Sequence, residues 1–142
     1  MPKNGIKSKS HVAESSWLAG IIDGEGYISF LPIRHRNQHL CRLIITNTDE
    51  AILNEIKRIL DKWLVFYSCS AVKLKVNRKQ AYNIEVNRQV EVSFVLEQVL
   101  PFLKSVKREK VKLIRDYMTQ PDILGRAKNT RGKRNIQFGL VI

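Results

Sequence analysis

The sequence predicts an α+β fold in which helices pack on one face of a four-stranded antiparallel sheet. Three observations lead to this prediction. Segments of helical period lie near the start, in the middle and near the end of the chain. Two pairs of strand-like segments lie between them, and a short polar turn joins each pair. The predicted order is therefore αββαββα(α): helix, two strands, helix, two strands and two helices.

The first helix and the first strand pair occupy the N-terminal third of the chain. Ser10 is placed to cap a helix that runs to about Gly24, where glycines end it. Strand-like runs follow at 27–33 and 40–46, on either side of the polar turn 34–39. These elements predict a hairpin that directly follows a helix.

The middle helix is predicted to begin near Thr48, because Asp49 and Glu50 favour the positive end of the helix dipole. Its apolar residues follow the helical period, and they are Ile52, Leu53, Ile56, Ile59, Leu60 and Trp63.

The second strand pair is predicted at 65–76 and 81–86, with the turn 77–80 between its strands. Apolar and polar residues alternate in both strands. This alternation predicts a sheet with one packed face and one polar face. The last two helices are predicted at 89–100, ending before proline, and at 105–118.

The length of 142 residues predicts one domain. We place this domain at 10–118, between a basic N-terminal arm at 1–9 and a basic C-terminal extension at 119–142.

The composition favours a nucleic-acid partner. The chain has 25 basic and 13 acidic residues, a formal charge of +12 and a pI near 10.0, and a polyanion would share this excess charge. A membrane surface fits less well, because the sequence has no long apolar span and no separate basic amphipathic helix. Residues 1–10 lack the apolar stretch of a secretory signal. Cys41 and Cys69 are too few for a disulfide framework or a zinc site, so we expect an intracellular protein.

The most informative segment reads Trp17-Leu-Ala-Gly-Ile-Ile-Asp-Gly-Glu-Gly26. Gly20 and Gly24 are four residues apart on a helix, which lets two helix backbones approach closely. Glu25 lies at a helix C-terminus, where the dipole disfavours negative charge, so a divalent cation is expected to compensate it. An ordinary buried helix with a glycine stop is the alternative. That alternative does not explain two acids and three glycines within seven residues.

This segment resembles the signature of the LAGLIDADG homing endonucleases. The resemblance is carried by Leu18, Ala19, Gly20, Ile21, Ile22, Asp23, Gly24, Glu25 and Gly26. The predicted order of elements over about 10–118 also matches the single-motif domain of that family. The sequence contains no second copy of the motif, and single-motif members work as homodimers through their motif helices. The resemblance therefore implies a dimer interface formed by Leu18, Gly20, Ile21 and Gly24.

The resemblance also implies an activity, namely site-specific cleavage of double-stranded DNA that leaves short 3′ overhangs. The cofactor would be Mg²⁺, with Mn²⁺ as a substitute, bound by the Glu25 carboxylate and the Gly24 carbonyl. Asn47 would hold a metal-bound water, although by itself it is more typical of a turn or cap. Lys107 would stabilise charge on the phosphate, with Lys104 as the alternative by spacing. Asp23 is expected to be structural.

The polar face of the sheet is expected to lie on DNA, because a two-stranded ribbon fits the major groove. Strand parity predicts DNA contacts from Ser29, Leu31, Ile33, Gln38, Arg42, Lys73, Lys75, Asn77, Asn83 and Glu85. The turns add Arg34, Arg36, Arg78 and Lys79, and the C-terminal extension adds Lys128 and Arg131. On such a face, leucine and isoleucine would contact thymine methyl groups. A register error of one residue would turn a whole strand to the other face.

Two alternatives to the endonuclease stay open. The first is an RNA-binding intron maturase on the same fold, and the second is a non-catalytic basic module in which the motif only makes a dimer contact. Glu25 favours the endonuclease, because neither alternative needs an acid there. The resemblance further implies an intron-encoded, DNA-associated protein in a prokaryotic cytoplasm or nucleoid, or in an organelle matrix.

Overall fold

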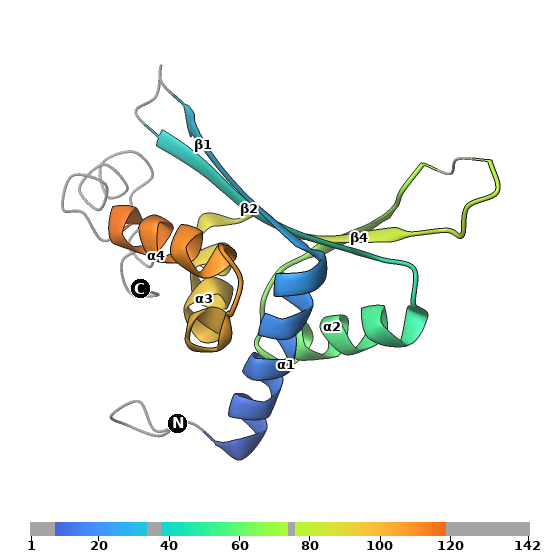
Figure 1. Ribbon diagram of the computed structural model, residues 1–142, viewed down its shortest axis with the longest axis horizontal. Coiled ribbons are helices and arrows are strands. Elements are labelled where there is room, and N and C mark those ends of the chain that lie inside the picture. Colours follow the sequence, from blue (N-terminus) through green and yellow to red (C-terminus); the bar gives the residue numbers. More distant parts are fainter. Residues whose placement is uncertain (1–7, 34–37, 74–75, 119–142) are drawn as a thin grey trace.

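The computed structural model describes residues 8–33, 38–73 and 76–118 (Figure 1). It confirms the predicted fold class and the predicted order of elements, with one short 3₁₀ turn added. The elements are α1 (Lys9–Glu25), β1 (Gly26–Ile33), β2 (Gln38–Asn47), α2 (Glu50–Lys62), β3 (Ser68–Ala71), β4 (Tyr82–Val86), α3 (Gln89–Val99), η2 (Leu100–Phe102) and α4 (Lys107–Met118).

The strands form one antiparallel sheet in the order β1-β2-β4-β3. Ser29 pairs with Arg42, and Ile44 pairs with both Tyr27 and Glu85. These pairs lie on the face opposite the helices, which we call the outer face. In Figure 1 the two strand pairs extend to opposite sides above the helices, so the outer face spans both of them.

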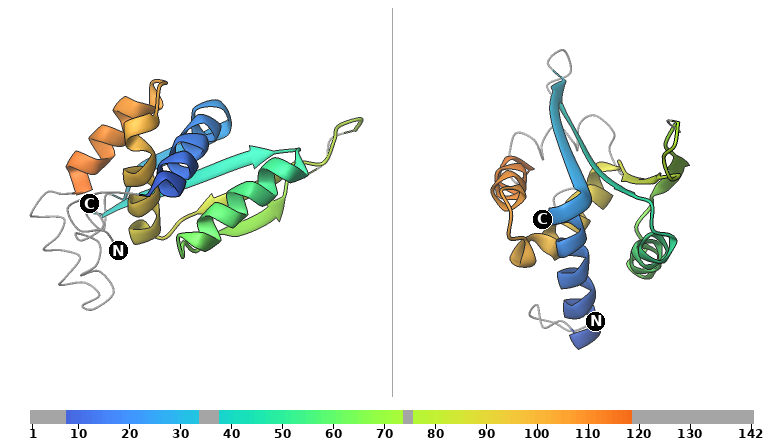
Figure 2. Two further views of the ribbon diagram at one scale, coloured as in Figure 1. Left: turned by 90° about the horizontal axis from the view of Figure 1, so that it is seen from below. Right: turned by 45° about the vertical axis from the view of Figure 1, so that its right-hand side comes forward.

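The helices cover the inner face of the sheet, as the views in Figure 2 show. The core is formed by buried aliphatic residues of the sheet and the helices, each 4% exposed or less; they include Leu18, Ile22, Ile28, Leu43, Ile45, Ile56, Ile84, Val86, Val95, Val111 and Ile114. Burying this apolar surface on one side of the sheet drives the fold. None of the described helices covers the other side of the sheet.

A buried carboxylate joins α1 to α2. Glu14 is 7% exposed and accepts hydrogen bonds from Lys62 Nζ at 3.1 Å and Arg58 Nη2 at 3.0 Å. Burial alone would raise the pKa of Glu14, but these two cations hold it below its usual value. The pair of helices is therefore fixed at the end of α1 that lies far from Glu25.

The start of α1 differs slightly from the prediction. Ser8, and not Ser10, caps α1, because its side chain accepts from the backbone N–H of His11. The start of α2 agrees with the prediction, since the helix begins at Glu50 and Asp49 caps it by accepting from Ala51 and Ile52. Serine and threonine close to a helix start compete for this role, and tertiary packing decides between them.

The predicted strand 65–76 is wrong over most of its length, because β3 covers only Ser68–Ala71. Beyond β3, the described residues keep a backbone hydrogen bond from Val72 N–H to Ala81 O at 2.9 Å. Val76 was expected to pack, yet it is 88% exposed, and Asn77 follows with a positive φ of 64°. The alternating pattern continues here into a part of the hairpin that extends beyond the helices (Figure 1), where an apolar side chain has nothing to pack on.

Both cysteines are free thiols. Burial raises the pKa of the Cys41 thiol to about 12, so this side chain stays protonated and unreactive. Among the described residues, no helix combines the length and the apolar character needed to cross a bilayer.

Candidate functional site

The chain passes from α1 to β1 without a loop, and Glu25 is the last residue of the helix. Gly26 begins the strand, and its backbone N–H donates to Ile22 O. A Cβ at Gly26 would lie 2.8 Å from Ile22 Cα and Ile22 O, closer than real Cβ atoms approach. Glycine is therefore required at this position. The exposed side chain of Glu25 is held where the helix meets the sheet, a position that we call the junction.

Asp23 binds the chain segment that precedes α4. Its carboxylate accepts from Lys104 N at 2.8 Å, Ser105 N at 3.0 Å and Ser105 Oγ at 2.5 Å. Burial alone would raise the pKa of Asp23, but these hydrogen bonds and the nearby charge of Lys107 hold it below its usual value. Asp23 thus has the structural role expected from the sequence.

Lys107 lies at the C-terminal end of α1. Its Nζ donates to Ile22 O at 2.8 Å and to Asp23 O at 2.9 Å. A cation there satisfies helix carbonyls and complements the helix dipole. Lys104 approaches the junction through its backbone amide, and its side chain is exposed. Of the two lysines left open by spacing, the structure brings the ammonium of Lys107 to the junction.

Asn47 is the last residue of β2 and leaves the sheet at the same end as the junction, since Gly26 pairs with Ile45. Its Oδ1 accepts from Asp49 N at 2.8 Å. This is the turn role that the residue type alone favours. The side chain is half-buried, and its amide nitrogen is the atom that a ligand at the junction would use.

The junction supplies oxygen donors suited to a hard divalent cation. Glu25 contributes a carboxylate and Gly24 a neighbouring carbonyl, whereas Asp23 is occupied by the segment before α4. Within the described part of the chain, no group of three or more histidine, cysteine, aspartate or glutamate residues could hold a metal ion. The described residues therefore do not supply a complete set of metal ligands at the junction.

The outer face carries most of the predicted contact residues of β1, β2 and β4. Arg42 and Glu85 form an ion pair at 3.8 Å, and Thr46 Oγ1 donates to Asn83 Oδ1. Leu31 is 53% exposed on this face, whereas Ser29 is buried at 3%. The backbone register pairs Ile33 with Gln38 at the far end of the hairpin.

The connection between β3 and β4 is basic and open. A hollow of about 590 Å³ there is lined by Thr48, Val72, Lys73, Asn77, Arg78, Lys79 and Ala81. Gln80 braces it by donating to Val72 O and Ala81 O, both at 2.8 Å. Lys73 and Asn77 thus lie in a loop and not on a strand face as predicted. The other predicted contacts, Lys75, Arg34, Arg36, Lys128 and Arg131, lie outside the described residues.

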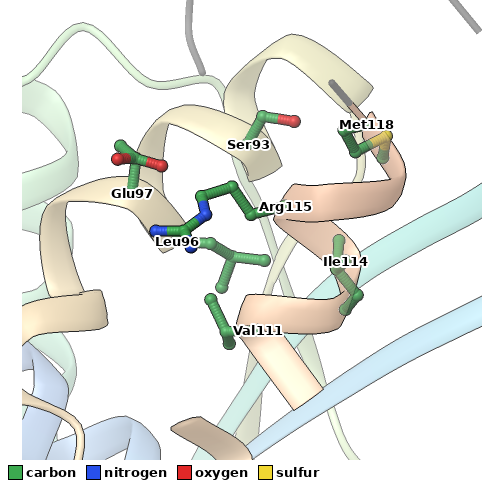
Figure 3. Close-up of a pocket in the computed structure, with 7 residues that line it drawn as sticks. All are labelled: Ser93, Leu96, Glu97, Val111, Ile114, Arg115 and Met118. Atoms are coloured by element: carbon green, nitrogen blue, oxygen red, sulfur yellow. The ribbon is translucent and has the colours of Figure 1, made fainter. Parts of the chain in front are cut away.

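A second concavity lies between α3 and α4, and Figure 3 shows the side chains around it. Its lining residues are Ser93, Leu96, Glu97, Val111, Ile114, Arg115 and Met118. Its volume of about 10 Å³ is about that of one water-sized probe, so it is too small for a ligand.

The solvent-facing side of α1 carries small residues. Ala13, Ser16, Gly20 and Gly24 are exposed and lie along one line of the helix. No atom of the described chain lies within 4 Å of a Cβ built at either glycine. Leu18, however, is fully buried in the core of the protomer. Its prediction as an interface residue is wrong, because it points to the sheet and not to solvent.

Two solved structures of the homing endonuclease I-CvuI match this architecture over nearly the whole chain. One is in complex with its target in the presence of calcium; it has a TM-score of 0.59 and 21% identity, covering 95% of this chain and 85% of that one. The chain has the LAGLIDADG homing-endonuclease fold. The other is in complex with the I-CreI target in the presence of magnesium, with the DNA not cleaved; its TM-score is 0.56, its identity 20%, and it covers the same shares of both chains. No protein-family model matches the sequence, and no curated protein matches it.

In this LAGLIDADG fold, Glu25 ends α1, Lys107 Nζ contacts the carbonyls of Ile22 and Asp23 just before it, and Asn47 ends β2. Sequence reasoning missed several outer-face positions. The register adds Tyr27, Leu40, Ile44, Thr46, Ser68 and Ser70. Continuing the alternation through β1 and β2 would have found the first four. Ser68 and Ser70 lie within the predicted strand 65–76 but precede Val72, where its alternating pattern begins.

Proposed function

We propose that this chain is a homodimeric, site-specific double-strand DNA endonuclease that depends on a divalent metal. The observation that carries the proposal is at the C-terminal end of α1, where Lys107 Nζ donates to Ile22 O and Asp23 O and the helix ends on the exposed Glu25. Phosphodiester hydrolysis would use the carboxylate to bind a metal ion, the ammonium to stabilise charge on the phosphate, and the open face of the sheet to bind the duplex.

The exposed side of α1 supports the dimer. A helix whose outward positions are alanine, serine and glycine allows a second helix to approach closely. Ile21, half-buried beside this line, would add apolar contact. Because Glu25 ends the same helix, pairing two copies of α1 would bring two carboxylates together, one for each DNA strand.

The donor set of the junction fits Mg²⁺, with Mn²⁺ as a substitute. Glu25 and the Gly24 carbonyl would hold the ion, and phosphate oxygens and waters would complete its shell. The bound ion would activate a water and stabilise the leaving oxygen. Lys107 uses two of its three N–H donors on helix carbonyls, and the third would donate to the phosphate. The amide nitrogen of Asn47 would orient the attacking water, and cleavage would leave short 3′ overhangs.

The outer face and the basic loop between β3 and β4 would bind the duplex. The formal charge of +12 and the exposed Lys73, Arg78 and Lys79 support this. The two I-CvuI structures with this fold are complexes with DNA, one with its own target and one with the I-CreI target. Phosphate contacts would fix the register, and outer-face side chains would contact base edges in the major groove. The protein would thus act where DNA is, as an intron-encoded enzyme of a prokaryote or an organelle.

The proposal is tested by incubating the full chain with Mg²⁺ and a library of long random duplexes, followed by sequencing of the cut ends. We expect cleavage at one related set of sites, with both strands cut. Salt-sensitive DNA binding without cleavage would favour the non-catalytic module. Tighter binding of structured RNA than of any duplex would favour the maturase.

A further inference from the structure

The outer face of β1 and β2 changes character from one cross-strand pair to the next. Moving away from the junction, three successive pairs are apolar, polar and apolar, namely Tyr27–Ile44, Ser29–Arg42 and Leu31–Leu40. Tyr27 and Leu31 are 60% and 53% exposed, and Lys110 Nζ lies 5.8 Å from the centroid of the Tyr27 ring. Apolar side chains left open on the uncovered face of so basic a chain indicate contact with apolar groups of a polyanion.

The polar pair is reinforced from the neighbouring strand. Arg42 Nη1 lies 3.8 Å from Glu85 Oε2, and Asn87 Nδ2 donates to the same carboxylate oxygen at 3.1 Å. Arg42 Nε is sealed from solvent without a hydrogen-bond partner among the described residues. The Arg42 side chain stays 37% exposed, so the part that emerges on the open face is the end of the guanidinium. The two charged groups are thus held side by side, and both are accessible from outside.

This arrangement matches the major-groove edge of one base pair. Guanine presents two adjacent acceptors, O6 and N7, which suit a guanidinium. Its partner cytosine presents the N4 amine, which donates to a carboxylate. An A·T pair offers no such adjacent acceptors to Arg42. The fixed Arg42–Glu85 pair is therefore complementary to a G·C pair.

The leucine pair has a different preference. The methyl group of thymine is the one apolar feature of the major groove, and Leu31 and Leu40 can pack against it. Placing them over a G·C edge would strip water from polar groups that receive no partner. Residues two apart on a strand are about 7 Å apart, which is about two base steps at 3.4 Å each.

We propose that the outer face reads one G·C pair with Arg42 and Glu85, and an A·T pair about two steps farther from the cleaved phosphates with Leu31 and Leu40. This assignment rests on the proposed DNA-binding function and names the bases that it selects. Arg42 and Leu31 are then the specificity-determining residues of this half-site.

The experiment begins with selection of duplexes by the full chain in the presence of a metal chelator, so that bound sites are not cut. We expect a guanine and a thymine two positions apart in each half-site. Arg42→Gln should lower the discrimination for guanine, which a bidentate contact sets at about fivefold to 150-fold. Arg108→Gln, which removes an exposed charge from α4, is the control and should keep the preference while weakening all sites alike.

Uracil then tests the methyl contact directly, because it differs from thymine only in lacking this group. Replacing the selected thymine by uracil should weaken binding by the parent about fourfold, the value for one buried methyl-sized group. The same replacement should have no effect on Leu31→Ala, and it should keep its full effect on the control Leu113→Ala, an exposed leucine on α4.

The outcomes distinguish failure of the base assignment from failure of the proposed endonuclease function. If the parent selects sites but Arg42→Gln keeps the guanine, or Leu31→Ala stays sensitive to uracil, the base assignment is wrong and the endonuclease proposal stands. If the parent enriches no duplex sequence at all, site-specific DNA binding is wrong and the base assignment falls with it.

Discussion

The junction and the outer face lie next to each other, yet they are built in opposite ways. At the junction, Asp23 accepts three hydrogen bonds and Lys107 donates two, all between segments more than 80 residues apart. On the outer face, Arg42 and Glu85 are 3.8 Å apart and the leucines touch solvent. In the proposed endonuclease, the positions that would carry out chemistry are thus fixed by hydrogen bonds between segments far apart in the sequence. Positions for recognition can be left open, because they cost the fold little when they change.

The largest loss of stability is expected from a substitution at Gly26, in the junction. In Gly26→Ala the new Cβ would meet Ile22 backbone at 2.8 Å, and backbone cannot move aside as a side chain can. We expect a loss of about 3 kcal/mol in the free energy of unfolding, the upper end for overpacking. Urea denaturation measures it. Gly24→Ala is the matched control within one chain, since its Cβ meets nothing within 4 Å among the described residues. Measured on dilute, monomeric protein, it should leave stability unchanged or slightly higher. Equal losses in both variants would show that the junction is not the tight contact described.

The next largest effect is expected on the rate of DNA cleavage, from a substitution at Lys107. Lys107→Ala should slow single-turnover cleavage about 10²-fold, as for other groups that stabilise developing charge. Lys104→Ala is the control from the same basic segment, and its rate should stay near that of the parent. Slow cleavage by the Lys104 variant alone would move the catalytic assignment by three residues. Weaker binding with unchanged rates in both would make Lys107 a phosphate contact only.

The stability that Asp23 contributes to the junction is expected to depend on pH. Its pKa lies below the usual value because Ser105 and the Lys104 amide stabilise the charged form against burial. The stability that it contributes is therefore present above the usual aspartate pKa of about 3.9 and is lost as pH falls through the lower folded-state pKa. We expect Asp23→Asn to cost about 2 kcal/mol at pH 7, as for hydrogen bonds to a charged group, and the difference from the parent to disappear in strong acid. Thermal unfolding from pH 7 to pH 2 checks this, and a gap that is constant with pH would contradict it.

The smallest effect is expected on the outer face. Leu31→Ala removes an exposed side chain, so the free energy of unfolding should change by less than about 0.5 kcal/mol. The same urea titration as for Gly26→Ala provides the measurement. If Leu31→Ala loses as much free energy of unfolding as Gly26→Ala, Leu31 belongs to the packed core and is not free to contact a partner.

The sequence predicted what depends on local pattern. The order of elements followed from periodicity, and the position of Glu25 followed from the motif. The outer-face sets of β1, β2 and β4 followed from alternation. The prediction of a strand at 65–76 was wrong over most of its length, because the alternating residues there have no helix to pack on. A strand pattern does not show whether another element lies against it.

Contacts between distant segments could not be predicted. The sequence favoured Lys107 but left Lys104 as an alternative by spacing, and only the fold shows which ammonium reaches the carbonyls of Ile22 and Asp23. The motif resemblance placed Leu18 on the dimer face, whereas packing against the sheet buries it completely. In both cases the deciding neighbour lies on another element.

We propose above that Glu25 holds the metal at the junction. The decisive measurement is single-turnover cleavage by Glu25→Gln in Mg²⁺. The substitution keeps the shape and removes the charge. It should abolish cleavage while DNA affinity, measured by titration, stays the same or increases, because repulsion from phosphates is relieved. Glu109→Gln, which changes an exposed acid on α4, should cleave at the parent rate. Cleavage by Glu25→Gln at the parent rate, or loss of DNA binding by a variant that is folded and dimeric, would contradict this account.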